Sequence, residues 1–139
     1  MTDKLFLDTN ILVYAHDVLH GRKREVARRV LEDAWEGRVS AGISIQVLQE
    51  FYTTMLRKGG DPHYYSTAID DYLYWPVVEN TRSLLQRTLD VHQRFGTSFY
   101  DANIIAAAQL AGAKELWSED FSTGQDYGGV VAVNPFEEL

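Results

Sequence analysis

Short apolar runs alternate with longer segments of helical spacing along the chain. Leu5, Phe6 and Leu7 form a continuous apolar run that is typical of a buried strand over residues 4–8. Further strands are predicted at residues 39–43, 115–118 and 130–133. Residues 76–78 suggest a short extended segment at a sheet edge, because Pro76 cannot donate to a ladder.

Helices are predicted between these strands, over residues 10–16, 22–35, 45–57 and 61–74, after a cap at Asn80 or Thr81, and over residues 99–111. Ser44, Asp61 and Ser98 are expected N-caps. In the fifth helix the expected apolar face consists of Leu84, Leu85, Leu89 and His92. Strands alternating with helices predict an α/β fold of three layers, in which helices flank a mostly parallel sheet of four to five short strands.

Composition narrows the class of protein. A length of 139 residues suits a single domain over residues 1–139. Without cysteine, disulfides, thiolate metal ligands and thiol nucleophiles are excluded. We expect a cytoplasmic protein with no membrane association, because neither a signal peptide nor an apolar run of ~20 residues is visible.

Charge bears on the kind of partner. The net charge is -7 and the pI is about 5.0, whereas a protein that binds nucleic acid mainly through its charge should be basic. A local site remains possible in which divalent cations neutralise carboxylates and bridge them to phosphate.

Four acidic residues occupy positions that a parallel sheet can bring together. Asp8 ends the first strand, Glu50 lies in the helix after the second, Asp101 opens the helix after Ser98, and Asp120 follows the strand at residues 115–118. Strand ends and the helix starts that follow them share one edge of such a sheet, where ligands bind.

Each of these acids also has a simpler interpretation. Asp8 can cap the following helix, Glu50 can be solvated, Asp101 can complement the helix macrodipole, and Asp120 can belong to a turn. As a group they repel one another unless a cation is present, and oxygen-only ligands suit Mg²⁺ or Mn²⁺. Such a cluster serves either metal binding or general acid–base chemistry.

Four stretches resemble the motifs of PIN-domain proteins, in the order of that family. They are LFLDTNILVY at residues 5–14, SIQVLQEF at 44–51, FYDANIIAAA at 99–108 and LWSEDF at 116–121. Their size and form are most similar to those of VapC toxins from toxin–antitoxin pairs. Two departures are the additional acid Glu119 beside Asp120 and the acidic pI.

The resemblance implies a Rossmann-like PIN fold and a metal-dependent ribonuclease that leaves 5′-phosphate and 3′-hydroxyl ends. It implies that Asp8, Glu50, Asp101 and Asp120 hold one or two Mg²⁺ or Mn²⁺ ions, with Asp8 and Asp101 as the firmest ligands. Asn10 and Ser118 are then expected to hydrogen-bond the carboxylates. The implied partners are an RNA substrate, a cognate antitoxin protein and a second copy of the chain.

Two other functions compete with this hypothesis. A phosphoryl-transfer enzyme could use Asp8 as an acceptor, although a haloacid-dehalogenase-type start needs a second Asp where Asn10 stands. A PIN-fold binding module without nuclease activity is the non-enzymatic alternative.

The basic residues and the histidines give weaker signals. Arg22, Lys23, Arg24, Arg28 and Arg29 form the densest positive group, and Arg57 with Lys58 a smaller one, and both are interpreted as solvated helix faces. None of the four histidines has a paired metal-ligand spacing, so none is assigned to a metal.

Overall fold

The computed structural model describes residues 4–139 of the chain. Within these residues the chain forms one six-stranded sheet in the order β3-β2-β1-β4-β6-β5. The strands are β1 (Lys4–Leu7), β2 (Ser40–Ser44), β3 (Val77–Val78), β4 (Glu115–Trp117), β5 (Asp126–Tyr127) and β6 (Val130–Val133). All pairings are parallel except that of β5 with β6, so the predicted mostly parallel α/β sheet is confirmed.

One strand more than expected is present. The sequence predicted four to five strands and missed β5, which pairs antiparallel with β6 across Gly128 and Gly129. Both glycines have positive φ values, of 65° and 100°. Tight hairpin turns require such angles, and glycine adopts them without a steric penalty.

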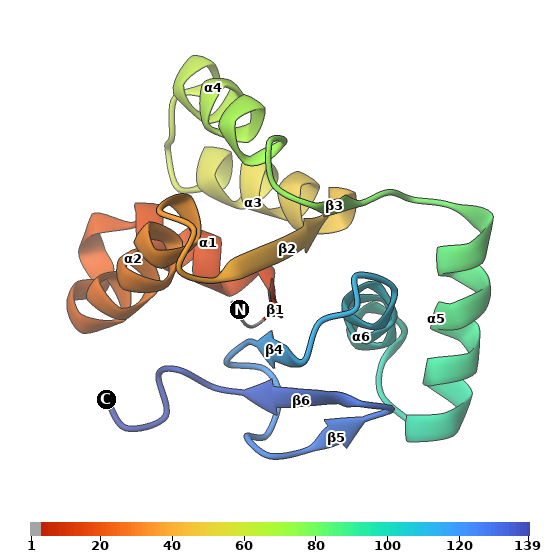
Figure 1. Ribbon diagram of the computed structural model, residues 1–139. Helices are drawn as coiled ribbons and strands as arrows, with labels where there is room; N and C mark the ends of the chain where they lie inside the picture. The colour runs from red at the N-terminus through yellow and green to blue at the C-terminus, as the bar shows by residue number, and fades with distance from the viewer. Residues whose placement is uncertain (1–3) are drawn as a thin grey trace.

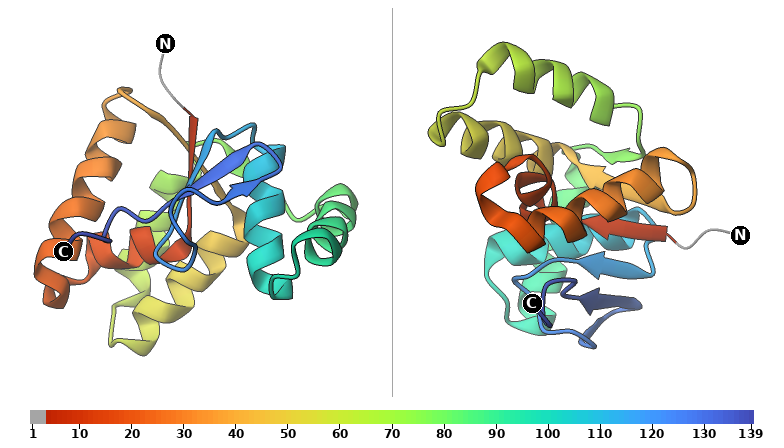
Figure 2. Two further views of the ribbon diagram at one scale, coloured as in Figure 1. Left: turned by 90° about the horizontal axis from the view of Figure 1, so that it is seen from below. Right: turned by 90° about the vertical axis from the view of Figure 1, so that its left-hand side faces the viewer.

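Helices cover both faces of the sheet. They are α1 (Thr9–His16), α2 (Gly21–Trp35), α3 (Ile45–Arg57), α4 (Pro62–Tyr72), α5 (Arg82–Phe95) and α6 (Phe99–Leu110), with a 3₁₀ turn at Val18–His20. Figure 2 shows α1 and α2 on one side of the sheet and α5 and α6 on the other. None of the helices formed within residues 4–139 has the length and apolarity that crossing a bilayer requires.

The expected N-caps explain where three helices begin. Ser44 accepts a hydrogen bond from the amide of Val47, Asp61 from that of Tyr64, and Ser98 from that of Asp101. These side chains satisfy amides that lack a partner in the first turn of a helix. Two of the caps, Ser44 and Ser98, therefore fix the helices that carry Glu50 and Asp101.

The expected apolar face of α5 is wrong in part. Leu84 is buried as predicted, but Leu85 and Leu89 are 51% and 43% exposed, and His92 is also exposed. Thr88 and Val91 complete the buried face instead, with the Thr88 hydroxyl satisfied by the carbonyl of Leu84. Positions 84, 88 and 91 follow the helical period, but a pattern of apolar residues alone does not include Thr88, because threonine is polar.

The carboxyl ends of β1 and β4 form the part of the sheet at which a ligand site is expected. β1 lies between β2 and β4, so the chain leaves β1 on one side and returns on the other (Figure 1). Ligands of open α/β sheets bind at such a switch point, outside the carboxyl ends of the strands. Leu7 pairs with Trp117, and the residues that follow these two are therefore neighbours.

Candidate functional site

Asp8 stands where β1 ends and α1 begins. Leu5, Phe6 and Leu7 are buried, and Asp8 is itself only 6% exposed. Its Oδ1 accepts a hydrogen bond of 2.7 Å from the amide of Thr9, and it is the N-cap of α1. The simpler interpretation of Asp8 as a helix cap is thus true, but it accounts for only one of the two carboxylate oxygens.

Ser118 occupies the other oxygen of Asp8. Its hydroxyl donates to Asp8 Oδ2 over 2.7 Å and accepts from the amide of Asp120 at 3.0 Å and from Asn10 Nδ2 at 3.3 Å. A hydroxyl has one donor and two acceptor positions, so Ser118 is fully used. It ties the end of β4 to the end of β1.

Asn10 connects this serine to Asp120. The Nδ2 group of Asn10 also lies 3.3 Å from Asp120 Oδ2, and its Oδ1 accepts from the amide of Glu119 at 3.4 Å. Asn10 and Ser118 therefore link the carboxylates of Asp8 and Asp120 by hydrogen bonds.

Glu50 reaches the same place from α3. Its Oε2 accepts a hydrogen bond of 2.9 Å from the Thr9 hydroxyl, and its Oε1 one of 2.7 Å from Gln46 Nε2. The sequence reasoning missed Thr9 and Gln46. A usable signal existed, because Gln46 precedes Glu50 by one helical turn and Thr9 directly follows Asp8.

A pocket of about 400 Å³ joins three of the four predicted acids. Its lining consists of Asp8, Thr9, Asn10, Val13, Tyr14, His20, Glu50, Thr54, Lys58 and Asp120. Asp101 does not line it. It lies half-buried in the first turn of α6, where its charge contributes to a raised pKa of Asp120.

Burial and like charge oppose ionisation in this pocket. Burial raises the pKa of Asp8 from 3.8 to about 6, against the lowering effect of Ser118 and Thr9, and the charges of Asp120 and Glu50 raise it further. The pKa of Asp120 is also raised, first by burial and then by Glu119, Asp101 and Glu50. A bound cation would reverse these shifts by favouring the charged carboxylates.

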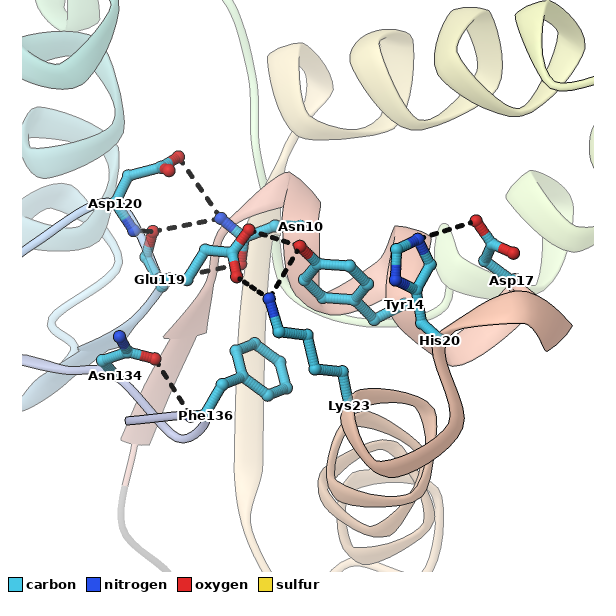
Figure 3. Close-up of polar contacts among 10 residues, drawn as sticks. Asn10, Tyr14, Asp17, His20, Lys23, Glu119, Asp120, Asn134 and Phe136 are labelled. Carbon is cyan, nitrogen blue, oxygen red and sulfur yellow. Dashed lines mark hydrogen bonds and ion pairs between the residues drawn. The ribbon is translucent and has the colours of Figure 1, made fainter. Parts of the chain in front are cut away.

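Glu119 and Asp120 face different surroundings, although they are neighbours in sequence. Glu119 accepts a hydrogen bond of 2.5 Å from the Tyr14 hydroxyl and pairs with Lys23 Nζ at 3.0 Å, as Figure 3 shows. Asp120 lies beside the amide of Asn10 and lines the pocket. The carboxylate of Glu119 thus has its own cation, and Asp120 is the better candidate for a ligand.

The donor set bears on which ion could bind. Within the described residues, no three acidic or histidine side chains stand together in a group that could hold a metal ion. Mg²⁺ usually binds through one or two carboxylates and keeps several waters, so it does not need such a group. The acids that line the pocket, Asp8, Glu50 and Asp120, are oxygen donors, which fits a hard divalent cation.

The comparisons with known proteins agree with this architecture. The sequence model of the PIN domain family matches residues 5–122. A toxin–antitoxin complex from Klebsiella pneumoniae includes a chain that is 25% identical, with a TM-score of 0.69 and coverage of 96% of this chain and 98% of that chain. The comparison with curated proteins gives no match.

Two further solved structures share the fold at lower identity. VapC20 of Mycobacterium tuberculosis, a toxin that cleaves the sarcin–ricin loop, is 19% identical with a TM-score of 0.61, over 81% of this chain and 86% of that chain. VapBC2 of Rickettsia felis, bound to a DNA fragment from its promoter, is 18% identical with a TM-score of 0.65, over 94% of this chain and 98% of that chain.

Proposed function

The chain belongs to the PIN-domain family, and we propose that it is a metal-dependent ribonuclease that hydrolyses RNA phosphodiester bonds, as the toxin of a VapBC-type pair. The main support is the convergence of Asp8, Glu50 and Asp120 on one pocket at the switch point of the sheet. Family membership and the fold shared with VapC20, a toxin that cleaves the sarcin–ricin loop, support the same reaction class.

In this proposal Asp8 and Asp101 are the main ligands of Mg²⁺ or Mn²⁺, and Glu50 and Asp120 act directly or through water. Asp101 does not line the pocket, and its place in this set rests on the family motif and on its charge acting on Asp120 from the first turn of α6. The bound ion would lower the pKa of a water molecule and offset charge on the phosphate. Asp8 contributes most through its position, because its carboxylate is buried and fixed at both oxygens.

The surrounding side chains keep these carboxylates in place. Ser118 and Asn10 link Asp8 to Asp120, while Thr9 and Gln46 hold the two oxygens of Glu50. Partners of this kind fix the orientation of metal ligands, and their loss typically costs about 10–100-fold in metal affinity or activity. We expect Ser118→Ala to weaken cleavage within this range.

Cleavage of RNA by the purified chain tests the proposal. We expect cleavage in Mg²⁺ or Mn²⁺ that stops with EDTA, and an Asp8→Asn variant at least about 100-fold slower. Asp70→Asn, the same change at an exposed position on α4, is the matched control and should cleave normally. Unchanged cleavage by Asp8→Asn contradicts the metal site, and a wild-type chain that cuts no RNA favours the binding module.

The adjacent acids allow a sharper test of the site. Asp120→Asn should slow cleavage strongly, whereas Glu119→Gln should change it little, because Glu119 already pairs with Lys23. Equal losses in both variants would contradict the assignment of Asp120 as the ligand.

The proposed partners are an antitoxin protein and a second copy of the chain. The antitoxin rests on the fold neighbours, among which are toxin–antitoxin complexes, and the second copy rests on the resemblance to the VapC toxins alone. A short neighbouring reading frame whose product inhibits cleavage on co-purification would establish the antitoxin. Light scattering of the purified chain would establish the dimer.

A further inference from the structure

Two basic side chains line the pocket that contains Asp8, Glu50 and Asp120, called the carboxylate pocket below. Lys58 follows the last residue of α3, and His20 ends the 3₁₀ turn between α1 and α2. The chain carries a net charge of -7, and the other lining residues that carry a formal charge are Asp8, Glu50 and Asp120. An RNA strand entering this pocket therefore meets its local positive charge at Lys58.

Lys58 is held in position by a buried acid. Asp17 is only 7% exposed, and its Oδ2 lies 3.0 Å from Lys58 Nζ and 3.2 Å from His20 Nε2. Its Oδ1 accepts a hydrogen bond from the amide of Leu19. Figure 3 shows the Asp17–His20 contact beside Tyr14, whose ring packs edge-on against His20 at 4.7 Å.

Asp17 remains charged at neutral pH and so attracts both partners. The hydrogen bond from Leu19 holds its pKa below the usual value, and Lys58 and His20 lower it further. A lysine ammonium has three N–H donors, of which Asp17 can engage only some. Lys58 is also 42% exposed, so its remaining donors are available to a ligand in the pocket.

We propose that Lys58, positioned by Asp17, binds a phosphate of the RNA strand beside the scissile one. This inference rests on the proposed ribonuclease function and deepens it by assigning a substrate contact. The carboxylate side of the pocket requires a cation before it can approach RNA, whereas the Lys58 side attracts the backbone directly. Asp17 is a positioning residue that makes no contact with substrate.

RNA binding without cleavage tests the contact. A fluorescent single-stranded RNA of mixed sequence is titrated, in EDTA, into Asp8→Asn protein carrying Lys58→Gln, Lys58→Arg or Arg57→Gln. Lys58→Gln should weaken binding about fivefold at low salt and reduce the slope of log affinity against log salt by about 0.7, the value for one phosphate contact to a single strand. Lys58→Arg should restore most of the slope.

Arg57→Gln is the matched control. It removes the same charge one residue earlier, and Arg57 is exposed and does not line the carboxylate pocket. Asp17→Asn should produce a smaller loss of affinity than Lys58→Gln, because it frees Lys58 without removing its charge. In the otherwise wild-type enzyme, Lys58→Gln should raise KM with little change in kcat.

The outcomes separate this inference from the proposed function. If wild-type protein cleaves RNA while Lys58→Gln behaves like Arg57→Gln in salt slope and KM, the inference is overturned. A lowered melting temperature as the only effect would show that Lys58 merely ties α3 to the turn after α1. If wild-type protein cleaves no RNA and the Asp8→Asn protein binds none, both proposals fail together.

Discussion

The two ends of α1 bury ionisable groups in contrasting surroundings. At its start, Asp8 is buried beside Glu50 and Asp120, and their charges and its burial raise its pKa to about 6. At its end, His16 is half-buried among aromatic rings, and burial lowers its pKa to about 4, with smaller contributions from Arg28 and Arg24.

The two groups also differ in whether their neighbours leave an uncompensated charge. The His16 ring shares a 2.7 Å hydrogen bond with the Tyr72 hydroxyl and packs within the aromatic cluster, defined as His16, Trp35, Phe51, Tyr64, Tyr65, Tyr72 and Trp75. A neutral histidine needs no counter-charge there. The carboxylates at the start of α1 have no such compensation and repel one another. We therefore interpret the start of α1 as adapted to bind a cation and its end as adapted for stability.

The largest expected effect lies in the aromatic cluster. Phe51 is fully buried against His16, Tyr65 and Tyr72, so Phe51→Ala should lower the free energy of unfolding by about 3–5 kcal/mol. Phe99→Ala, at a position that is 40% exposed, should cost much less. Urea denaturation measures both, and equal losses would contradict the role of the cluster.

Asp8→Asn should act in the opposite direction and stabilise the protein without metal. The folded state binds the Asp8 proton more tightly than the unfolded chain does, so stability falls as the pH rises from about 4 to about 6. Asp8→Asn removes the charge of Asp8 and should raise the free energy of unfolding by about 1–3 kcal/mol at pH 7, with no gain near pH 4. Thermal melts in EDTA across this range measure the gain, and a gain that is independent of pH would contradict the argument.

Adding metal should reverse that order of stability. Mg²⁺ at 100 times its dissociation constant should stabilise the wild-type chain by about 2.7 kcal/mol, because the ion binds the folded state. The Asp8→Asn variant should gain far less, and Asp70→Asn should respond as wild type does. Melting temperatures recorded against Mg²⁺ and Mn²⁺ concentration measure the shift. Equal shifts in melting temperature for wild type, Asp8→Asn and Asp70→Asn would show that the ion binds away from Asp8.

The smallest effect concerns the hydrogen bond at His16. Tyr72→Phe removes its hydroxyl partner and should cost about 1–2 kcal/mol while leaving RNA cleavage unchanged. Tyr74→Phe, at an 87% exposed position, is the control and should be neutral. The stability that the neutral His16 contributes to the protein is lost as the pH falls from 6.5 towards 4, because the pKa of His16 is lowered in the folded state. If Tyr72→Phe lowers stability without changing cleavage, the C-terminal end of α1 serves stability and not the reaction. A loss of cleavage at normal stability would contradict this division.

Much of the fold and of the candidate site follows from local sequence. The apolar run before Asp8 predicts a buried strand that ends in a carboxylate, and Ser44 and Ser98 predict the starts of the helices that carry Glu50 and Asp101. These features depend on neighbours within a few residues, where hydrophobic periodicity and capping chemistry are legible. The four motifs in order also identified the family, which the match over residues 5–122 confirms.

Other features were decided by contacts between distant parts of the chain. Glu119 and Asp120 are equivalent acids in the sequence, and only Lys23 and Tyr14, about a hundred residues away, turn Glu119 out of the pocket. The contact between Asp17 and Lys58 likewise joins elements whose distance no local pattern encodes. A strand end determines that a carboxylate reaches the sheet edge, whereas its charge partner depends on which side chains the tertiary fold places within ion-pair distance.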